Sequence, residues 1–216
     1  DFSVGFFTGE GNTPNKVTLE KARDINSLNQ TTRNQTYRQI DYCPVCGAGN
    51  PKEMNVYFDE QAWVLKHKCT CCGFEPPIYI IDDEIYRNVP TFVISTIDKM
   101  ALLGTTKSFK SLIGSVKGKC PQHGYFVGSR CECPRCNGNA EIIYDRKDPA
   151  PTLIIQDELH LVNSSLGTFD SHYESLFKYL CENNPNLNNR KTVKYIGATA
   201  TISNAEIHIR NLYNLN

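Results

Sequence analysis

The chain has 216 residues, with 23 basic side chains, 23 acidic side chains and ten cysteines. That length suits one α/β domain or two small ones and is enough to bury a real core. No apolar run approaches the roughly 18–20 residues of a membrane span, and no charged and then apolar segment opens the chain. These patterns exclude an integral membrane protein and a signal peptide, and they favour a cytoplasmic location. Because the first residue is Asp1 and not Met, we expect a fragment of a longer protein.

The elements follow from hydrophobic periodicity and turn residues, taken in chain order. Strands are expected at residues 2–7, 78–81, 91–95, 153–155 and 193–196, and a hairpin at residues 54–58 and 62–67. Helices are expected at residues 17–29, 96–103, 170–181 and 203–213, and a loop at residues 31–38. Thr96 and Ser203 are the candidate N-caps. Outside the cysteine-rich segments, strands alternate with helices, which predicts an α/β fold with a parallel sheet.

Nine of the ten cysteines lie between Cys43 and Cys136, and most belong to C-x-x-C knuckles. Such a knuckle points two sulfurs at one centre, and four thiolates in a tetrahedron select zinc. The first zinc site is therefore expected at Cys43, Cys46, Cys69 and Cys72, with Cys71 as a competitor for Cys69 or Cys72. The hairpin between these knuckles makes the segment a zinc ribbon.

The second zinc site is expected at Cys120, His123, Cys133 and Cys136. Here Cys131 competes with His123, and we prefer His123 because it occupies the knuckle position and precedes a glycine. The competing interpretation of all these cysteines is a disulfide framework in a secreted protein, which the missing signal peptide disfavours.

Charge is uneven although the total is neutral. Residues 104–147 hold eight basic and three acidic side chains, whereas residues 40–90 hold eight acidic and four basic ones. Local positive charge attracts phosphate regardless of the overall sum. The expected nucleic-acid contacts of the second zinc module are therefore its basic residues, Lys117, Lys119, Arg130 and Arg135. The alternative is a solvated, lysine-rich loop.

Polar motifs follow three of the expected strands. Asp157 and Glu158 end the strand at residues 153–155, and Thr199 follows the strand at residues 193–196. Thr96 follows the strand at residues 91–95. In an open α/β sheet, ligands bind at the carboxyl ends of the strands, and two carboxylates there can hold Mg²⁺ and orient a water. We expect the three motifs along one edge of one sheet.

These motifs resemble those of superfamily 2 (DExH-type) helicases. Asp157-Glu158-Leu159-His160 is similar to their Walker B motif, Thr199-Ala200-Thr201 to their motif III, and Ser95-Thr96-Ile97-Asp98-Lys99 to a motif that contacts the nucleic-acid backbone. More narrowly, several stretches resemble the DrmA helicases of bacterial DISARM anti-phage systems. The stretches are Thr13-Pro14-Asn15, Asp83-Glu84-Ile85-Tyr86-Arg87, residues 90–99 and residues 154–161.

The resemblance implies roles for individual residues. Asp157 would position Mg²⁺, and Glu158 would be the catalytic base for ATP hydrolysis. His160 and the Thr199-Ala200-Thr201 motif would couple the nucleotide state to nucleic-acid binding. Thr96 would touch the phosphate backbone, assisted by Lys99.

The sequence departs from the helicase pattern in one respect. It contains no Gly-Lys-Ser/Thr loop of the kind that binds the phosphates of ATP, and residues 104–108 only superficially resemble one. We therefore expect the later part of a first RecA-like domain, inactive as an ATPase by itself, whose full-length parent is an ATP-dependent helicase. The remaining helicase domains, defence-system subunits and nucleic acid, DNA in preference to RNA, are the expected partners. The alternative is a zinc-ribbon module that binds nucleic acid or protein without ATP chemistry.

The expected organisation has five segments. Residues 1–40, 77–114 and 148–216 would form the partial RecA-like sheet with its helices, and residues 148–216 would carry the Walker B and motif III strings. Residues 41–76 and 115–147 would be the two zinc-binding insertions.

Overall fold

The computed structural model describes residues 2–8, 14–48, 54–136, 141–142, 151–158, 165–183, 193–199, 206–207 and 209–210. The chain divides into two compact units, each of them discontinuous in sequence. Unit 1 comprises Asp1–Thr96 and Lys117–Ile142, and unit 2 comprises Ile97–Val116 and Ile143–Asn216. Within the described residues, no helix is both long and apolar enough to cross a membrane.

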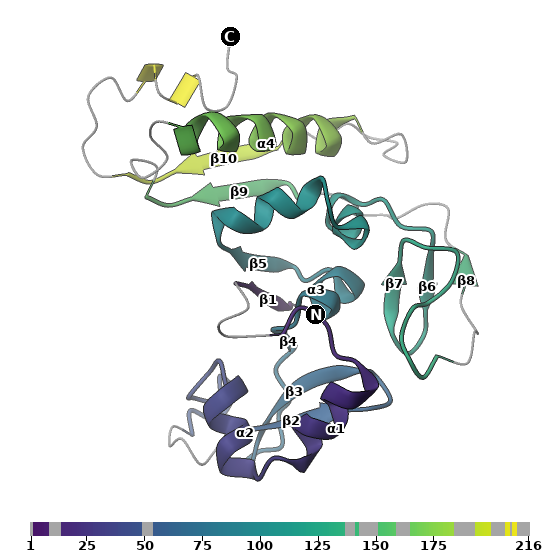
Figure 1. Ribbon diagram of the computed structural model, residues 1–216. Helices are drawn as coiled ribbons and strands as arrows, with labels where there is room; N and C mark the ends of the chain where they lie inside the picture. The colour runs from purple at the N-terminus through teal and green to yellow at the C-terminus, as the bar shows by residue number, and fades with distance from the viewer. Residues whose placement is uncertain are drawn as a thin grey trace. The chain divides into compact units, whose positions relative to one another are not determined.

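Unit 1 contains a three-stranded parallel sheet in the order β4-β1-β5 (Figure 1). Its strands are β1 (Val4–Phe7), β4 (Ile78–Tyr79) and β5 (Phe92–Ser95). Parallel strands need a crossover between them. Helix α3 (Asp82–Asn88) supplies it, since it lies between β4 and β5 in the chain and contacts both β1 and β4.

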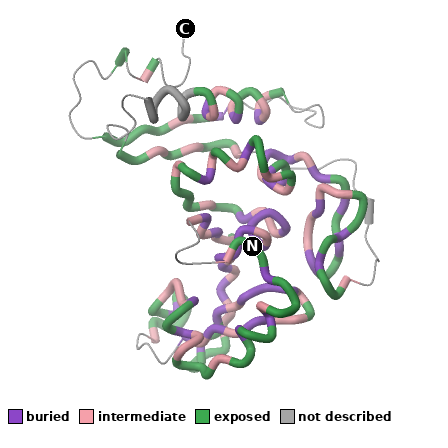
Figure 2. The backbone as a smooth tube through the Cα atoms, in the orientation of Figure 1, coloured by how far each residue is buried: buried purple, intermediate pink, exposed green. Residues whose placement is uncertain are grey.

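A long antiparallel hairpin forms the second part of unit 1. Strands β2 (Met54–Asp59) and β3 (Val64–Cys69) pair over six positions, as the alternating aromatic and β-branched residues predicted. Trp63 ends the turn in a left-handed conformation, with φ of 56°, and its indole N–H donates to the Val17 carbonyl at 3.1 Å. Figure 2 shows that this hairpin and α3 contain much of the buried chain of unit 1.

Helices α1 (Leu19–Ser27) and α2 (Gln30–Tyr37) pack on β2. The expected loop at residues 31–38 is thus a helix. Its inward face is polar, because the Asn34 side chain is buried and accepts from the Val56 N–H at 2.8 Å. Asn29 caps the helix by accepting from the Thr32 N–H at 2.9 Å. A search for apolar periodicity misses a helix of this kind.

The last part of unit 1 is a small antiparallel sheet in the order β7-β6-β8. It consists of β6 (Gly118–Cys120), β7 (Gly124–Phe126) and β8 (Glu141–Ile142). Phe126 and three cysteines of this segment belong to the same buried cluster as Val56, Phe58 and Trp63 of the hairpin. The two cysteine-rich segments therefore share one hydrophobic core.

Unit 2 contains β9 (Leu153–Gln156) and β10 (Lys194–Gly197), which pair in parallel, and helix α4 (Ser165–Glu182). The expected helix at residues 96–103 is a 3₁₀ helix, η1 (Ile97–Leu103), followed by a second one, η2 (Lys107–Ile113). Phe177 of α4 packs edge-to-face on Phe109 of η2 at 6.3 Å between ring centroids. Residues 206, 207, 209 and 210 are helical, whereas Ser203 lies outside the described residues.

The fold is therefore a mixed α/β fold with parallel strands, as expected. The described strands do not form the single parallel sheet that was expected. Strand β5 pairs with β1 in one sheet, and β9 pairs with β10 in another.

Candidate functional sites

The first candidate metal centre closes the open end of the β2–β3 hairpin. The Sγ atoms of Cys43, Cys46, Cys69 and Cys72 all lie within 4.8 Å of one another. Each knuckle is a tight turn in which the N–H of Gly47 or Gly73 bonds back to the first cysteine carbonyl at 2.9 Å. Both glycines have φ near +70°, in the left-handed region that favours glycine.

The sulfur geometry of this centre fits zinc. The Sγ atoms of Cys43 and Cys72 are 3.6 Å apart, and those of Cys46 and Cys69 are 3.7 Å apart. A tetrahedron with Zn–S bonds of about 2.3 Å places its sulfurs roughly 3.8 Å apart. The backbone N–H of Cys46 lowers the pKa of the Cys43 thiol to about 6. The hydrogen bond from the Ala48 N–H acts to lower the pKa of the Cys46 thiol, but burial and the neighbouring thiols outweigh it and raise that pKa to about 12. A bound cation would favour the thiolate form of all four. Cys71 is exposed and lies outside this group.

The second candidate metal centre lies between β6 and the segment that follows β7. Its members are Cys120, His123, Cys131 and Cys136, again within 4.8 Å of one another. His123 Nδ1 is 3.3 Å from the Cys120 sulfur and 3.6 Å from the Cys131 sulfur. Cys120 and Cys136 sulfurs are 3.8 Å apart. Three thiols and one imidazole at these distances are a zinc-type set.

This set differs from the one expected from spacing, in which Cys133 was a ligand and Cys131 competed with His123. Cys131 and Cys133 are both buried, with Glu132 exposed between them, so both thiols point inward. A tetrahedral centre accepts four donors, and here His123 and Cys131 both belong to it. Cys133 is the fifth donor. Burial raises the pKa of its thiol to about 11, although the positive charge of Arg87 acts to lower it.

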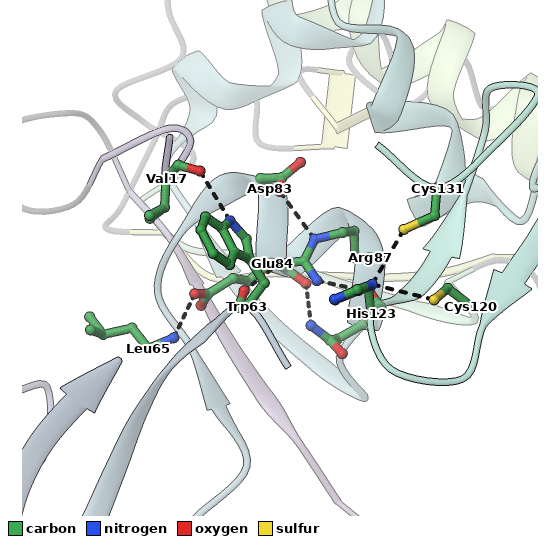
Figure 3. Close-up of polar contacts among 10 residues, drawn as sticks. Val17, Trp63, Leu65, Asp83, Glu84, Arg87, Cys120, His123 and Cys131 are labelled. Carbon is green, nitrogen blue, oxygen red and sulfur yellow. Dashed lines mark hydrogen bonds and ion pairs between the residues drawn. The ribbon is translucent and has the colours of Figure 1, made fainter. Parts of the chain in front are cut away.

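His123 is fixed from two sides (Figure 3). Its carbonyl accepts from Arg87 Nη1 at 2.8 Å, and its ring nitrogen Nδ1 faces the sulfurs of Cys120 and Cys131. Burial, followed by the charge of Arg87, lowers the pKa of His123 and so favours the neutral imidazole that binds metal.

The sequence motifs predict no role for Arg87 or Glu84 of α3, yet the structure buries both. Arg87 is 7% exposed and also pairs with Asp83 at 3.1 Å. Glu84 is 1% exposed and accepts from the Leu65 N–H at 2.7 Å, and burial raises the pKa of its carboxyl to about 8. Charged residues in a short helix resemble a solvated surface in sequence, so no local signal reveals their burial.

The strand-end acids lie in unit 2. Parallel pairing places Gln156 opposite Gly197, and the Ala198 N–H donates to the Gln156 carbonyl at 2.8 Å. Asp157 and Thr199 therefore follow adjacent strands at the same edge. The Asp157 carboxylate accepts from the Glu158 N–H at 2.9 Å, and Glu158 has φ of 56°. His160, Ala200 and Thr201 lie outside the described residues.

The third motif belongs to the other sheet. Thr96 directly follows β5 of unit 1, and its N–H donates to the Phe7 carbonyl at 3.3 Å. Lys99 lies in η1 of unit 2 and is only 7% exposed. The expected contact of Lys99 with a phosphate backbone stays a prediction.

The four basic residues of the second module differ in their surroundings. Lys117, Lys119 and Arg130 are exposed, and no ion pair joins them to another described residue. Arg135 instead pairs with Glu60 at 2.5 Å. The Lys119 ammonium lies 5.3 Å from the centre of the Tyr125 ring, which sequence reasoning did not single out. Tyr125 stands opposite Lys119 in the β6–β7 register.

No family model matches the chain. The DISARM protein DrmA of Bacillus paralicheniformis is 34% identical over 239 aligned residues, which cover 99% of this chain and 20% of DrmA. The chain therefore spans about a fifth of the length of this relative. Identity at that level along almost the whole chain shows that the protein is related to DrmA.

Proposed function

We propose that this chain is part of a DrmA-type, ATP-dependent superfamily 2 helicase or translocase that acts on nucleic acid in anti-phage defence. The similarity to DrmA along 99% of the chain carries the proposal. The second support is the adjacency of Asp157 and Thr199 at the ends of two paired parallel strands. A RecA-like sheet uses this edge for nucleotide chemistry, following the general rule for ligand sites in open α/β sheets.

In this proposal the chain provides the acidic half of an ATP site. Bound Mg²⁺ and ATP would supply the phosphoryl chemistry. Asp157 would orient the metal-bound water shell, and Glu158 would take the proton from the attacking water. Thr199, which follows the neighbouring strand, would couple this nucleotide site to nucleic-acid binding, together with His160, Ala200 and Thr201. The chain lacks a Gly-Lys-Ser/Thr loop, and we expect no ATP hydrolysis from it alone.

Both metal centres would have structural roles, holding zinc to order unit 1. The second module would also contact nucleic acid, DNA in preference to RNA, through Lys117, Lys119 and Arg130. Arg135 contributes less in this proposal, because Glu60 neutralises its charge. Thr96 stays a proposed backbone contact at the end of β5.

The test of nucleic-acid binding is the salt dependence of affinity for labelled single-stranded and double-stranded DNA and RNA, measured by fluorescence anisotropy. The variant reverses three charges together, Lys117→Glu, Lys119→Glu and Arg130→Glu. We expect weaker binding and a log–log salt slope that is smaller by about 2–3, since each lost phosphate contact removes about 0.9. A control variant reverses two exposed cations elsewhere in unit 1, Lys16→Glu and Arg23→Glu, and the changes in slope are compared per reversed charge. Equal slopes for variant and control would remove the second module from the interface.

The ATP half of the proposal is tested in the longer protein that it implies. Glu158→Gln should abolish nucleic-acid-stimulated ATP hydrolysis and leave nucleotide binding intact, because the amide keeps the shape but cannot accept a proton. Normal hydrolysis by this variant would contradict the assignment of Glu158.

The second candidate function is a double zinc module that binds nucleic acid or protein without ATP chemistry. It is favoured by one observation: both metal centres are assembled in unit 1, whereas the acids lie in unit 2. It predicts that Asp157→Ala and Glu158→Gln leave every activity of the longer protein unchanged, and that charge reversal in the second module still weakens binding.

A further inference from the structure

One buried guanidinium bonds both to the second metal centre and to the turn of the hairpin whose other end carries the first centre. Arg87 of α3 donates from Nη2 to the Trp63 carbonyl at 2.7 Å and from Nη1 to the His123 carbonyl at 2.8 Å. Its Nε donates to Asp83 at 3.1 Å. Trp63 lies in the turn of the hairpin whose strand β3 ends at Cys69 of the first centre, and His123 belongs to the second centre. Figure 3 shows Arg87 with Trp63 and His123.

Two further contacts tighten the same junction. Arg135, next to the ligand Cys136, pairs with Glu60, in the turn that also contains Trp63. Gly124, with φ of 83°, lies against α3 so closely that a Cβ there would come within 2.4 Å of the Arg87 carbonyl oxygen. The second module therefore contacts both α3 and the hairpin turn through residues at or next to a metal ligand.

We propose that Arg87 is a positioning residue that couples the two metal centres, so that they load and release metal as one unit. Metal at the second centre orders the loop that presents the His123 carbonyl. When that loop is lost, the Arg87 charge stays buried with fewer acceptors, which is costly. The hairpin turn that Arg87 also holds is then destabilised, and with it the strand that delivers Cys69. The effect is reciprocal, because coupling between two binding equilibria must be.

The coupling is independent of helicase activity and rests on unit 1 alone. It is measured on the purified chain loaded with Co²⁺, whose ligand-field bands differ between a four-sulfur and a three-sulfur, one-nitrogen site. EDTA is added stepwise, and each set of bands is followed separately. In the wild type we expect both sets to disappear at the same EDTA concentration.

The variant Arg87→Met keeps an unbranched side chain of similar length and removes the charge with all its donors. We expect the three-sulfur, one-nitrogen centre to release Co²⁺ at an EDTA concentration about tenfold lower, with the four-sulfur centre retained. The matched control is Arg33→Met. Arg33 also donates to main-chain carbonyls, those of Ile25, Asn26 and Leu28, but contacts no metal ligand. Arg33→Met should lower thermal stability, while both centres still release Co²⁺ at the same EDTA concentration.

Two results would overturn the proposal: separate midpoints in the wild type, or coincident midpoints in Arg87→Met as in Arg33→Met. If Arg87→Met does not fold, Cys136→Ser and Arg87→Lys replace it. Disabling the second centre with Cys136→Ser should weaken Co²⁺ binding at the four-sulfur centre about tenfold. The weakening should shrink in the Arg87→Lys background, since one ammonium cannot reach both carbonyls. No weakening with Cys136→Ser would reject coupling.

Discussion

The two metal modules are similar in composition but differ in how their ligands are chosen. In the first, two complete C-x-x-C-G knuckles at the ends of one hairpin supply four sulfurs, and the only extra thiol, Cys71, faces solvent. In the second, five donors lie within residues 120–136, and four of them converge. Spacing settles a ligand set where there are as many inward-facing donors as coordination positions. Where there is one donor too many, the packing of the chain makes the choice.

The largest effect that tests this comparison is metal removal. Structural zinc binding contributes about 10–16 kcal/mol in small modules, so a strong chelator should unfold both. Trp63 is the sole tryptophan of the chain and is 2% exposed, so its fluorescence reports the shared core. We expect a shift of the emission to longer wavelength with chelator and recovery with Zn²⁺. Unchanged emission in the metal-free chain would show that the core folds without the centres.

A sharper test replaces Cys131 and Cys133 of the second module by serine, one at a time. Cys131→Ser should lower the zinc content from two ions per chain to one, whereas Cys133→Ser should keep two. The reason is that Cys131 lies 3.6 Å from His123 Nδ1 and Cys133 lies outside the converging group. Elemental analysis and native mass spectrometry measure the content. The reverse result would restore the set expected from spacing alone.

The buried carboxyl of Glu84 gives a smaller, pH-dependent effect. Its pKa is raised from 4.5 to about 8, so the folded chain holds this proton where the unfolded chain has released it. Stability from this group is full below pH 4.5 and is lost as the pH rises toward 8. Glu84→Gln should therefore gain stability relative to the wild type, by up to about 1.4 kcal/mol per pH unit in that window.

Urea unfolding of the zinc-loaded proteins at pH 5.5 and pH 7.5 measures this difference. Glu75→Gln is the control, since Glu75 is a more exposed carboxylate of the same unit that pairs with Lys68 at 3.2 Å. A difference between Glu84→Gln and the wild type that does not change with pH would mean that Glu84 is ionised in the folded chain.

The smallest effect is expected at the spare thiol of the first module. Cys71→Ser should leave the zinc content at two and change the free energy of unfolding by no more than about 0.5 kcal/mol, because Cys71 is exposed. Labelling of the zinc-loaded protein with a thiol reagent should lose its fastest site. A loss of zinc would place Cys71 among the ligands and weaken the contrast between the two modules.

The sequence by itself determined the local features of this protein. The β2–β3 hairpin, the main strands and the first cysteine set follow from alternation and from paired knuckles, which act over a few residues. Only the tertiary structure decided the helix at Gln30–Tyr37, whose buried face is polar, and the choice between Cys131 and Cys133. It alone revealed Arg87, which bonds to carbonyls 24 and 36 residues away in the chain. Such contacts depend on which surfaces meet in space, and no local pattern in a sequence contains that information.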